Sequence, residues 1–410
     1  MPADDHKNDP ANRMTDPALE AEIARRSGRW GATLPRADER DHLLVRSGTL
    51  VVVAGTDVDQ EHVSTGEEIL VGTNASCDVV LHDAAVSRFH CRVTLGGKSV
   101  TVRDLGSANG TLVDGVAVLE AQLKSGAVLT VGRTQLRFDL GGQPVRVPLS
   151  TEDRFGRLHG GSVAMRRVYA RLQAAPDVAV LFEGEEGTGK ATAARSLHEA
   201  GPRKAGPFVL ADAAAAEEDA FEEARGGTLY LREVAEVPVA RQGRLAALAA
   251  ASPDVRVMAG SRRNLQVEVN ARRLAMDLYR RVAGWTCRLP PLREHPEDLP
   301  ALVDLALERT GGRESERLRT RDVYAELSRH TWPGNVRQLF AFVELASDPR
   351  RAPDPDAEVA QHFAAWIAEH EVRLVTEALN AAHGERTAAA RDVGVDAARF
   401  AALLHRHGLD

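Results

Sequence analysis

The chain is poor in cysteine and aromatic residues and contains no long apolar run. Among its 410 residues there are three cysteines, and aromatic residues make up 4%. The scattered Cys77, Cys91 and Cys287 cannot build a disulfide framework, which favours a reducing compartment. No apolar run approaches the ~18 residues that a membrane span requires, and the polar, acidic N-terminus predicts no secretory signal. We therefore expect a cytoplasmic protein without a membrane partner, and set aside secreted, membrane and fibrous classes.

Positive charge is not in excess either. Lys and Arg total 52 against 59 for Asp and Glu, which gives a net charge of −7. This balance argues against a protein that coats nucleic acid with its whole surface, although it is compatible with one small DNA-reading domain. Apolar residues make up 43% and charged residues 27%, which is enough to build hydrophobic cores. At ~150 residues per domain, the length predicts two or three domains.

The residue pattern changes along the chain and divides it into segments. Short β-type runs separated by turn signals predict an all-β sandwich in the first part. Strands then alternate with helical stretches, which is the signature of an α/β domain, and the rest of the chain is helical. The predicted segments are a flexible tail (1–41), an all-β sandwich (42–140), a linker (141–155), an α/β domain (156–310), a helical extension (311–350), a second linker (351–361) and an all-α segment (362–410).

The sequence GEEGTGK at 184–190 has the spacing of a phosphate-binding loop. It follows an apolar run and precedes a helical stretch, which is the strand–loop–helix context that such a loop requires. The glycines let backbone N–H groups turn toward phosphate oxygens, and the helix N-terminus and a lysine add positive potential. A glycine-rich turn without a ligand is the alternative. The pattern predicts an ATP site formed by Gly184, Gly187, Thr188, Gly189 and Lys190.

A second acidic position is expected at the end of the apolar strand 226–234, which reads Arg232-Glu233. In a nucleotide hydrolase such a strand ordinarily ends in Asp-Glu, where the Asp holds Mg²⁺ and the Glu polarises water. A cation at the Asp position opposes Mg²⁺ by ~4 kcal/mol per unit charge at ~4 Å and an effective dielectric constant of ~20. We therefore expect ATP binding with impaired Mg²⁺-dependent hydrolysis. The alternative is a tolerated change on a working enzyme, and a sharper hypothesis is that the Arg232 guanidinium replaces the metal.

Several motifs in order resemble the bacterial enhancer-binding AAA+ activators that work with sigma-54 RNA polymerase. They include GEEGTGKATAARSLHEAGPRKAGPF, GGTLYLREV, MDLYRRV, LPPLREHPEDLP and WPGNVRQL. The resemblance implies an AAA+ ATP-binding domain over 156–310 with a helical lid over 311–350, a homo-oligomeric ring, and RNA polymerase as a partner. It further implies that Glu233 polarises water, that Arg281 is an arginine finger acting in trans, and that Arg337 senses the γ-phosphate.

The sequence departs from that family at positions on which its activity depends. Arg232 stands at the metal-binding Asp, Arg262 at the sensor Asn, and Ala275 at the first finger position. The signature GAFTGA loop is absent, because residues 213–225 read AAAAEEDAFEEAR, and 238–254 is too short for the second pore-facing insertion. We therefore expect an atypical regulator with a degenerate core rather than a normal sigma-54 activator.

In the first domain, VGTNASCDVVLHDAAVSRFHCRV followed by DLGSANGTLVDG resembles a forkhead-associated (FHA) domain, a β-sandwich that binds phosphothreonine through its loops. A phosphate dianion is held by hydroxyl, amide and guanidinium donors that converge from loops, and Ser87, Arg88 and Asn109 can supply these. The resemblance makes His90 a structural residue beneath the loop. The usual Gly-Arg of the family reads Gly-Thr at 72–73, so an arginine contact to the phosphopeptide is lost. An ordinary strand entry is the alternative for Ser-Arg.

The C-terminal stretch 384–410 is read as helix, tight turn, helix, and resembles the Fis-type helix-turn-helix at the end of these activators. The predicted DNA-binding residues are Arg399 and Arg406. The reading face is otherwise poor in donors for DNA, and residues 371–410 hold five Arg, no Lys and six acidic residues. A helical dimerisation or packing module is therefore the alternative.

Three functions fit this organisation. The favoured one is a phosphothreonine-responsive, ATP-binding transcription regulator whose partners are a phosphothreonine protein, DNA and RNA polymerase, because its three modules occur in this order in the family it resembles. The second is a phosphoprotein-binding signalling scaffold with a relic ATPase core and a helical oligomerisation tail. The third is an active ATP-driven activator, against which Arg232 and the missing loop argue. Specific DNA binding separates the first two.

Overall fold

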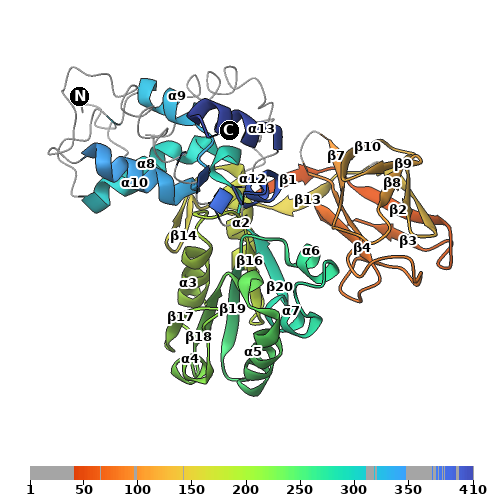
Figure 1. Ribbon diagram of the computed structural model, residues 1–410, viewed down its shortest axis with the longest axis horizontal. Helices are drawn as coiled ribbons and strands as arrows, with labels where there is room; N and C mark the ends of the chain where they lie inside the picture. Colours follow the sequence, from red (N-terminus) through yellow and green to blue (C-terminus); the bar gives the residue numbers. More distant parts are fainter. Residues whose placement is uncertain are drawn as a thin grey trace, which may run out of the picture.

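A β-sandwich, an α/β domain, a helical lid and short C-terminal helices follow one another in the computed structural model, with the sandwich beside the α/β domain (Figure 1). The predicted linker 351–361 and all but the last residue of the predicted tail 1–41 lie outside the described residues. Within the described part, no helix is long and apolar enough to cross a membrane. The structure describes residues 41–310 except 65, 97–98 and 142, and then 318, 321–347, 372, 375–376, 378–380, 382, 384–393 and 397–409.

The first domain is the predicted sandwich of two sheets around one apolar core. Alternating burial shows why: Thr134, Leu136 and Phe138 are buried, whereas the residues between them are exposed, which is the period of two of a half-buried strand. One sheet contains, in order, β10 (Glu120–Leu123), β7 (Val100–Asp104), β6 (Cys91–Thr94), β4 (Glu68–Gly72) and β5 (Val79–Val80). The other contains β3 (Glu61–Val63), β2 (Gly48–Ala54), β12 (Thr134–Leu140), β11 (Val128–Val131), β8 (Thr111–Val113) and β9 (Val116–Val118).

Two short strand pairs connect the sandwich to the next domain. The first joins β1 (His42–Val45) to β13 (Val145–Pro148) in antiparallel pairing, and the second joins β14 (Arg154–Phe155) to β15 (Leu158–His159). β13 lies within 141–155, which the sequence pattern predicts as a linker. None of its four residues is buried, so no alternation of buried and exposed residues predicts this strand from the sequence. The strand forms through its antiparallel pairing with β1.

The second domain is a parallel five-stranded sheet covered by helices, as the strand–helix alternation predicts. The sheet order is β17 (Phe208–Asp212), β18 (Thr228–Arg232), β19 (Arg256–Ser261), β16 (Val180–Glu183) and β20 (Trp285–Arg288). Every residue of β16 and β19 is buried, as expected for strands covered on both faces. The loop after β16, an interior strand, leaves the carboxyl edge of the sheet, where open α/β sheets bind ligands. The helices are α2 (Val163–Gln173), α3 (Lys190–Ala200), α4 (Glu218–Glu223), α5 (Val239–Ala251), α6 (Leu265–Asn270) and α7 (Met276–Val282), with 3₁₀ turns η2 (Val234–Glu236), η3 (Leu292–Glu294) and η4 (Pro296–Asp298).

The lid is a small helical layer built around a buried tryptophan. Trp332 is 1% exposed, and its indole N–H donates to the Leu327 carbonyl at 2.9 Å, so a large apolar ring is buried without an unpaired donor. Asn335 ties the turn after it to the ATPase domain, because its side-chain oxygen accepts from the Leu292 N–H at 2.8 Å and its amide donates to the Glu186 carbonyl at 2.8 Å. The helices are α8 (Leu299–Thr310), α9 (Arg321–Arg329) and α10 (Asn335–Ser347).

The described part of the C-terminal segment includes the helices α12 (Arg386–Val393) and α13 (Ala397–His407), and its described residues between 372 and 380 are also helical. Their positions agree with the predicted helix pair, but the residues of the turn between them are outside the described part. The helix-turn-helix therefore stays a prediction. The helices and the preceding segment share a small apolar core of Val375, Ala378, Ala389, Ala390, Phe400 and Leu404.

Candidate functional site

The loop after β16 has the backbone shape of a phosphate-binding loop. Gly187 and Gly189 have φ of 76° and 94°, in the left-handed region that favours glycine. A Cβ on Gly187 would lie 2.0 Å from the Gly334 carbonyl oxygen, so the close approach of the lid also requires glycine there. Thr188 is buried, and its hydroxyl donates to the Glu185 carbonyl at 2.9 Å. The predicted ATP-binding residues of this loop, including Gly184, are thus brought together at the N-terminus of α3.

Lys190 begins α3 and is 8% exposed. Its Nζ donates to the carbonyl oxygens of Gly184 (2.8 Å) and Glu185 (3.1 Å), which bends the side chain back over the loop. Burial lowers the pKa of Lys190, and the Glu233 carboxylate partly offsets this. The ammonium group therefore sits in a partly desolvated site, where it can meet the outer phosphates of a nucleotide.

Glu233, the predicted water-polarising residue, has both carboxylate oxygens engaged. Oε1 lies 3.4 Å from Lys190 Nζ, and Oε2 accepts from the backbone N–H of Arg262 at 3.0 Å. Its backbone φ is +48°, an uncommon conformation for a residue with a side chain, which persists only where surrounding contacts impose it. The geometry thus holds Glu233 beside the phosphate loop, paired with the lysine.

Arg232 ends β18 and faces the same cavity. Its side chain is 54% exposed, and its Nη2 lies 4.0 Å from Asp212 Oδ2. The residue after Lys190 is Ala191, where phosphate loops that bind Mg²⁺ carry the hydroxyl of Ser or Thr. A guanidinium and a methyl group thus replace two oxygen ligands, and no cluster of metal-binding side chains occurs among the described residues. This donor set does not fit Mg²⁺.

The lid is closed onto the loop through two acidic residues. The Glu185 carboxylate accepts two hydrogen bonds from Arg293, at 2.7 and 2.5 Å, and this pairing raises the pKa of Arg293. Glu186 accepts from Arg337 Nη1 at 2.7 Å. Arg337, which the resemblance predicts to sense the γ-phosphate, therefore lies at the loop but is paired with one of its carboxylates. Sequence patterns alone did not predict this pairing.

A cavity of about 1240 Å³ lies beside these contacts and is lined by both the phosphate loop and the lid. Its polar lining contains the cations Lys190, Arg232 and Arg337 together with carboxylates, among them those of Asp212 and Glu233. A cleft with cations and apolar walls has the composition of a nucleotide site. Arg281 is exposed on α7, outside this cavity, where it could act only on a neighbouring subunit. The apolar walls include Leu158, Met165, Leu302, Leu305, Val336 and Phe340.

The predicted phosphothreonine residues lie on two adjacent loops of the sandwich. The Ser87 hydroxyl accepts from the Ala108 N–H at 2.9 Å, and the Asn109 amide donates to the Ala85 carbonyl at 2.7 Å, so each loop holds the other. Arg88 and Asn109 are exposed, and Arg88 has no ion pair in the described structure. The three residues thus meet at one accessible edge of the sandwich, as a phosphate site requires.

His90 supports these loops from below. It is fully buried, its Nδ1 accepts from the Ser87 N–H at 3.1 Å, and its Nε2 lies 3.0 Å from the Gly110 carbonyl oxygen. These partners fit a neutral ring protonated at Nε2, and burial lowers the pKa of His90. Gly72 completes the support, because a Cβ there would lie 2.2 Å from the Arg88 carbonyl oxygen.

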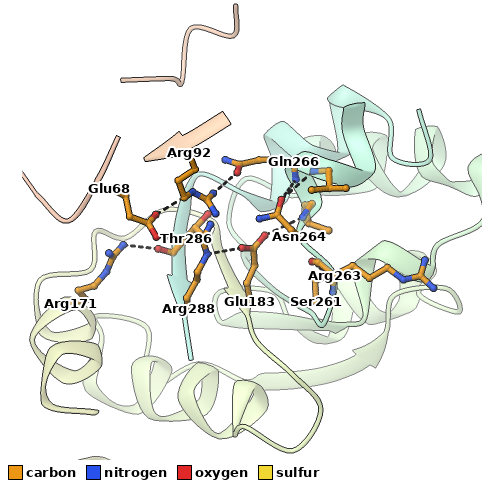
Figure 2. A network of polar contacts seen from close by, with 12 residues as sticks. Glu68, Arg92, Arg171, Glu183, Ser261, Arg263, Asn264, Gln266, Thr286 and Arg288 are labelled. Carbon is orange, nitrogen blue, oxygen red and sulfur yellow. Dashed lines mark hydrogen bonds and ion pairs between the residues drawn. The ribbon is translucent and has the colours of Figure 1, made fainter. Parts of the chain in front are cut away.

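A polar network joins the sandwich to the ATPase domain, and no sequence motif indicated it (Figure 2). Arg288 donates from Nε to Glu183 at 3.1 Å and from Nη1 to Glu68 at 2.6 Å. Arg92 of the sandwich lies 3.4 Å from Glu68 and donates to the Gln266 side chain at 2.5 Å. Burial lowers the pKa of Arg92. The network connects the residue before the phosphate loop to β4 and β6.

The predicted DNA-binding residues both fall on α13. Arg406 is exposed in its last turn, and Arg399 lies in its first half, although the side chain of Arg399 is outside the described part. Both residues are far along the chain from the phosphate sites, and their role stays a prediction.

The sheet order, the phosphate loop and the lid define a P-loop ATPase domain. The chain matches the profile of the sigma-54 interaction domain over 160–292 and that of the AAA+ ATPase lid domain over 293–348. It is 33% identical over 315 residues to the response regulator protein PilR of Pseudomonas aeruginosa, a match that covers 62% of this chain and 70% of PilR. The chain belongs to the family of sigma-54-dependent transcriptional regulators, which confirms the resemblance found in the sequence.

The match to a second relative covers a smaller share of that relative's length. The nitrogen assimilation regulatory protein NtrX of Azorhizobium caulinodans is 36% identical over 219 residues, which is 44% of this chain and 47% of NtrX. The chain thus spans about half the length of that relative.

The N-terminal domain has the β-sandwich fold that its motifs predicted. Residues 51–140 match the profile described as the cytoplasmic domain of an inner membrane component of the type III secretion system. A structure from a study of phosphothreonine-dependent FHA domain interactions is 27% identical, covers 23% of this chain and 97% of its own, and has a TM-score of 0.22.

Proposed function

We propose that the protein is a phosphothreonine-responsive transcription regulator that binds ATP and hydrolyses it poorly. The observation that carries the nucleotide part is the cavity in which Lys190 and Arg232 face the same space, with no cluster of metal-binding side chains among the described residues. Two cations and the N–H groups at the start of α3 can neutralise the phosphates of ATP. Nucleotide binding then orders the lid rather than driving turnover.

The weak hydrolysis follows from the same geometry. Phosphoryl transfer relies on positive charge at the transferred group and on a residue that orients the attacking water. Glu233 is held by Lys190 and by the Arg262 backbone, and these two partners compete with a water for its carboxylate oxygens. Arg337 must release Glu186 before it can contact a γ-phosphate. These two pairings support a site that holds a nucleotide more readily than it cleaves it.

The proposed loss of the sigma-contacting loop is supported by the connection between β17 and β18. Residues 213–227 form a turn, the short helix α4 and a second turn, and GAFTGA does not occur in the sequence. A regulator of this kind acts by repression, by assembly with intact relatives, or through another contact with RNA polymerase.

The recognition parts of the proposal rest on two surfaces. Arg88 and Asn109 are accessible on loops that Ser87 and His90 hold in place, which suits a phosphothreonine peptide. The exposed Arg406 on α13 and the neighbouring Arg399 are the residues proposed to contact DNA. The acidic balance of 371–410 favours the second candidate, a phosphoprotein scaffold in which these helices mediate assembly.

Selection of the purified full chain against a random duplex DNA library, at one near-physiological salt concentration, separates the two functions, because non-specific binding depends on salt. Enrichment of one palindromic site, lost in Arg399→Glu/Arg406→Glu, supports the regulator. A folded, oligomeric protein that enriches no site would overturn DNA binding and leave the scaffold.

A further inference from the structure

Both phosphate-reading loops of the sandwich are docked on helices α6 and α7 of the ATPase. Phe89, which follows Arg88, is 0% exposed, and its ring centroid lies 5.1 Å from that of Tyr279 on α7. Together with Cys77 and Leu105, Phe89 belongs to the apolar core of the ATPase domain rather than to the core of the sandwich. The loop that carries Arg88 is therefore anchored in the other domain.

Asn270, the last residue of α6, binds the backbone of both loops at once. Its side-chain nitrogen donates to the carbonyl oxygens of Phe89 at 2.5 Å and Leu105 at 2.9 Å. Its side-chain oxygen faces the Phe89 N–H at 3.5 Å. Phe89 is adjacent to Arg88, and Leu105 begins the turn that leads to Asn109. One amide of the ATPase thus fixes the spacing between the two halves of the proposed phosphate site.

We infer that Asn270 is a positioning residue for phosphothreonine recognition, so that phosphopeptide binding and docking of the sandwich on α6 favour each other. The inference rests on the proposed binding of phosphothreonine at Arg88 and Asn109. A bidentate or converging set of donors loses affinity when its members shift by about 1 Å, and the Asn270 amide prevents such a shift. By thermodynamic linkage, if docking of the sandwich strengthens phosphopeptide binding by a given free energy, phosphopeptide binding strengthens docking by the same free energy.

The consequence reaches the nucleotide site. α6 begins at Leu265, whose N–H donates to Glu183 Oε1 at 3.1 Å, and Glu183 directly precedes the phosphate loop. α7 carries Arg281. A phosphopeptide on the sandwich therefore acts on helices that border both the nucleotide loop and the surface of the proposed arginine finger.

The test uses the full chain and a fluorescent degenerate peptide library with a central phosphothreonine, alongside its unphosphorylated counterpart. Asn270→Ala and the isosteric Asn270→Asp, which removes both amide donors, are expected to weaken phosphopeptide binding roughly tenfold. Gln266→Ala is the comparison variant, because Gln266 lies on the same helix and bonds Arg92, which is on neither reading loop, so it removes a docking contact without releasing the loops. Its affinity is expected to fall by no more than about twofold, because Asn270 still holds both loops.

Amide hydrogen exchange distinguishes positioning of the two loops by Asn270 from a general effect of Asn270 on folding. In the wild type, and in Gln266→Ala, the phosphopeptide is expected to slow amide exchange in residues 265–270 of the ATPase. In Asn270→Ala this protection is lost while the chain stays folded, as its unfolding curve shows. Both measurements use the folded chain, so a variant that fails to fold is recognised by its unfolding curve and replaced by the other.

The outcomes separate the two levels of the proposal. A wild-type chain that binds no phosphothreonine peptide, or binds one equally well after Arg88→Ala, contradicts the proposed phosphate site. A wild type that binds and an Arg88→Ala variant that does not, combined with Asn270 variants indistinguishable from Gln266→Ala, overturns the inference about Asn270 alone.

Discussion

Replacing Arg232 by aspartate is expected to make nucleotide binding depend on Mg²⁺. Arg232 Nη2 lies 4.0 Å from the neighbouring carboxylate oxygen of Asp212, and this distance is taken for the distance to a metal. At ~4 Å a unit charge interacts with a divalent ion by about 2 kcal/mol even with bulk-water screening, and the substitution changes the charge by two units. The side chain is 54% exposed, so half of this total is assigned to side-chain motion. About 2 kcal/mol remains, or roughly thirtyfold in Mg²⁺ affinity.

The assay is calorimetric titration of Mg²⁺ into the ATP-saturated chain, followed by measurement of phosphate release. Arg232→Ala, which removes one charge, is expected to give about half the free-energy change of Arg232→Asp. Arg225→Asp is the charge-matched control, because Arg225 is 68% exposed, pairs with Glu222 and does not line the cavity. Tight Mg²⁺ binding by the wild type, or equal effects of Arg232→Asp and Arg225→Asp, would refute the electrostatic reasoning.

Three further predictions follow from the same contacts. Lys190→Ala is expected to weaken ATP binding by about 100-fold, measured with a fluorescent nucleotide, because it removes the cation held against the loop; an unchanged affinity would place the nucleotide elsewhere. Gly72→Ala is expected to destabilise the sandwich by about 1–3 kcal/mol in urea unfolding, because its Cβ would lie 2.2 Å from the Arg88 carbonyl oxygen, and a neutral effect would contradict this packing. Burial lowers the pKa of His90 below its usual 6.5, so His90 binds a proton more tightly in the unfolded chain than in the folded one. The contribution of neutral His90 to the free energy of unfolding is therefore complete above pH 6.5 and falls as the pH drops below it. His90→Gln should flatten this acid dependence, and a sandwich that gains stability on mild acidification would contradict the sign.

The domains and the phosphate loop were predictable because their signals are local. The spacing of GEEGTGK between an apolar strand and a helix specifies its own backbone, and the hairpin turn at Asp114-Gly115 has the positive φ angles, 49° and 83°, that its residue types predict. Strands such as β9 and β13 were missed because they are short and contain no buried residue. Their pairing partners, rather than their own sequence, make them strands.

The connections between domains were not predictable, for a related reason. Glu68 and Arg288 are 220 positions apart, and Asn270 is 181 positions from Phe89, so no local pattern links them. An Asn at the end of a short helix reads as an ordinary helix terminus, and Phe89 reads as an inward residue of a strand. Only the docked arrangement of the two domains shows that Asn270 of the ATPase domain holds the loop of the sandwich that contains Phe89.

The contacts that the site residues make with one another could not be predicted from the sequence either. Resemblance indicated that Glu233 and Arg337 face a nucleotide, whereas the structure pairs Glu233 with Lys190 and Arg337 with Glu186. Glu186 carries its charge within the phosphate loop itself, and the contact of Arg337 with it depends on where the lid lies. Such pairings are set by tertiary distances, which motif spacing does not contain.

Equilibrium binding of ATP to the wild-type chain, measured with Mg²⁺ and again with excess chelator, tests the central claim most directly. A site in which Lys190 and Arg232 neutralise the phosphates predicts dissociation constants that agree within about threefold under the two conditions. Loss of ATP binding on chelation would contradict the account and would show that the cavity recruits a metal in spite of Arg232.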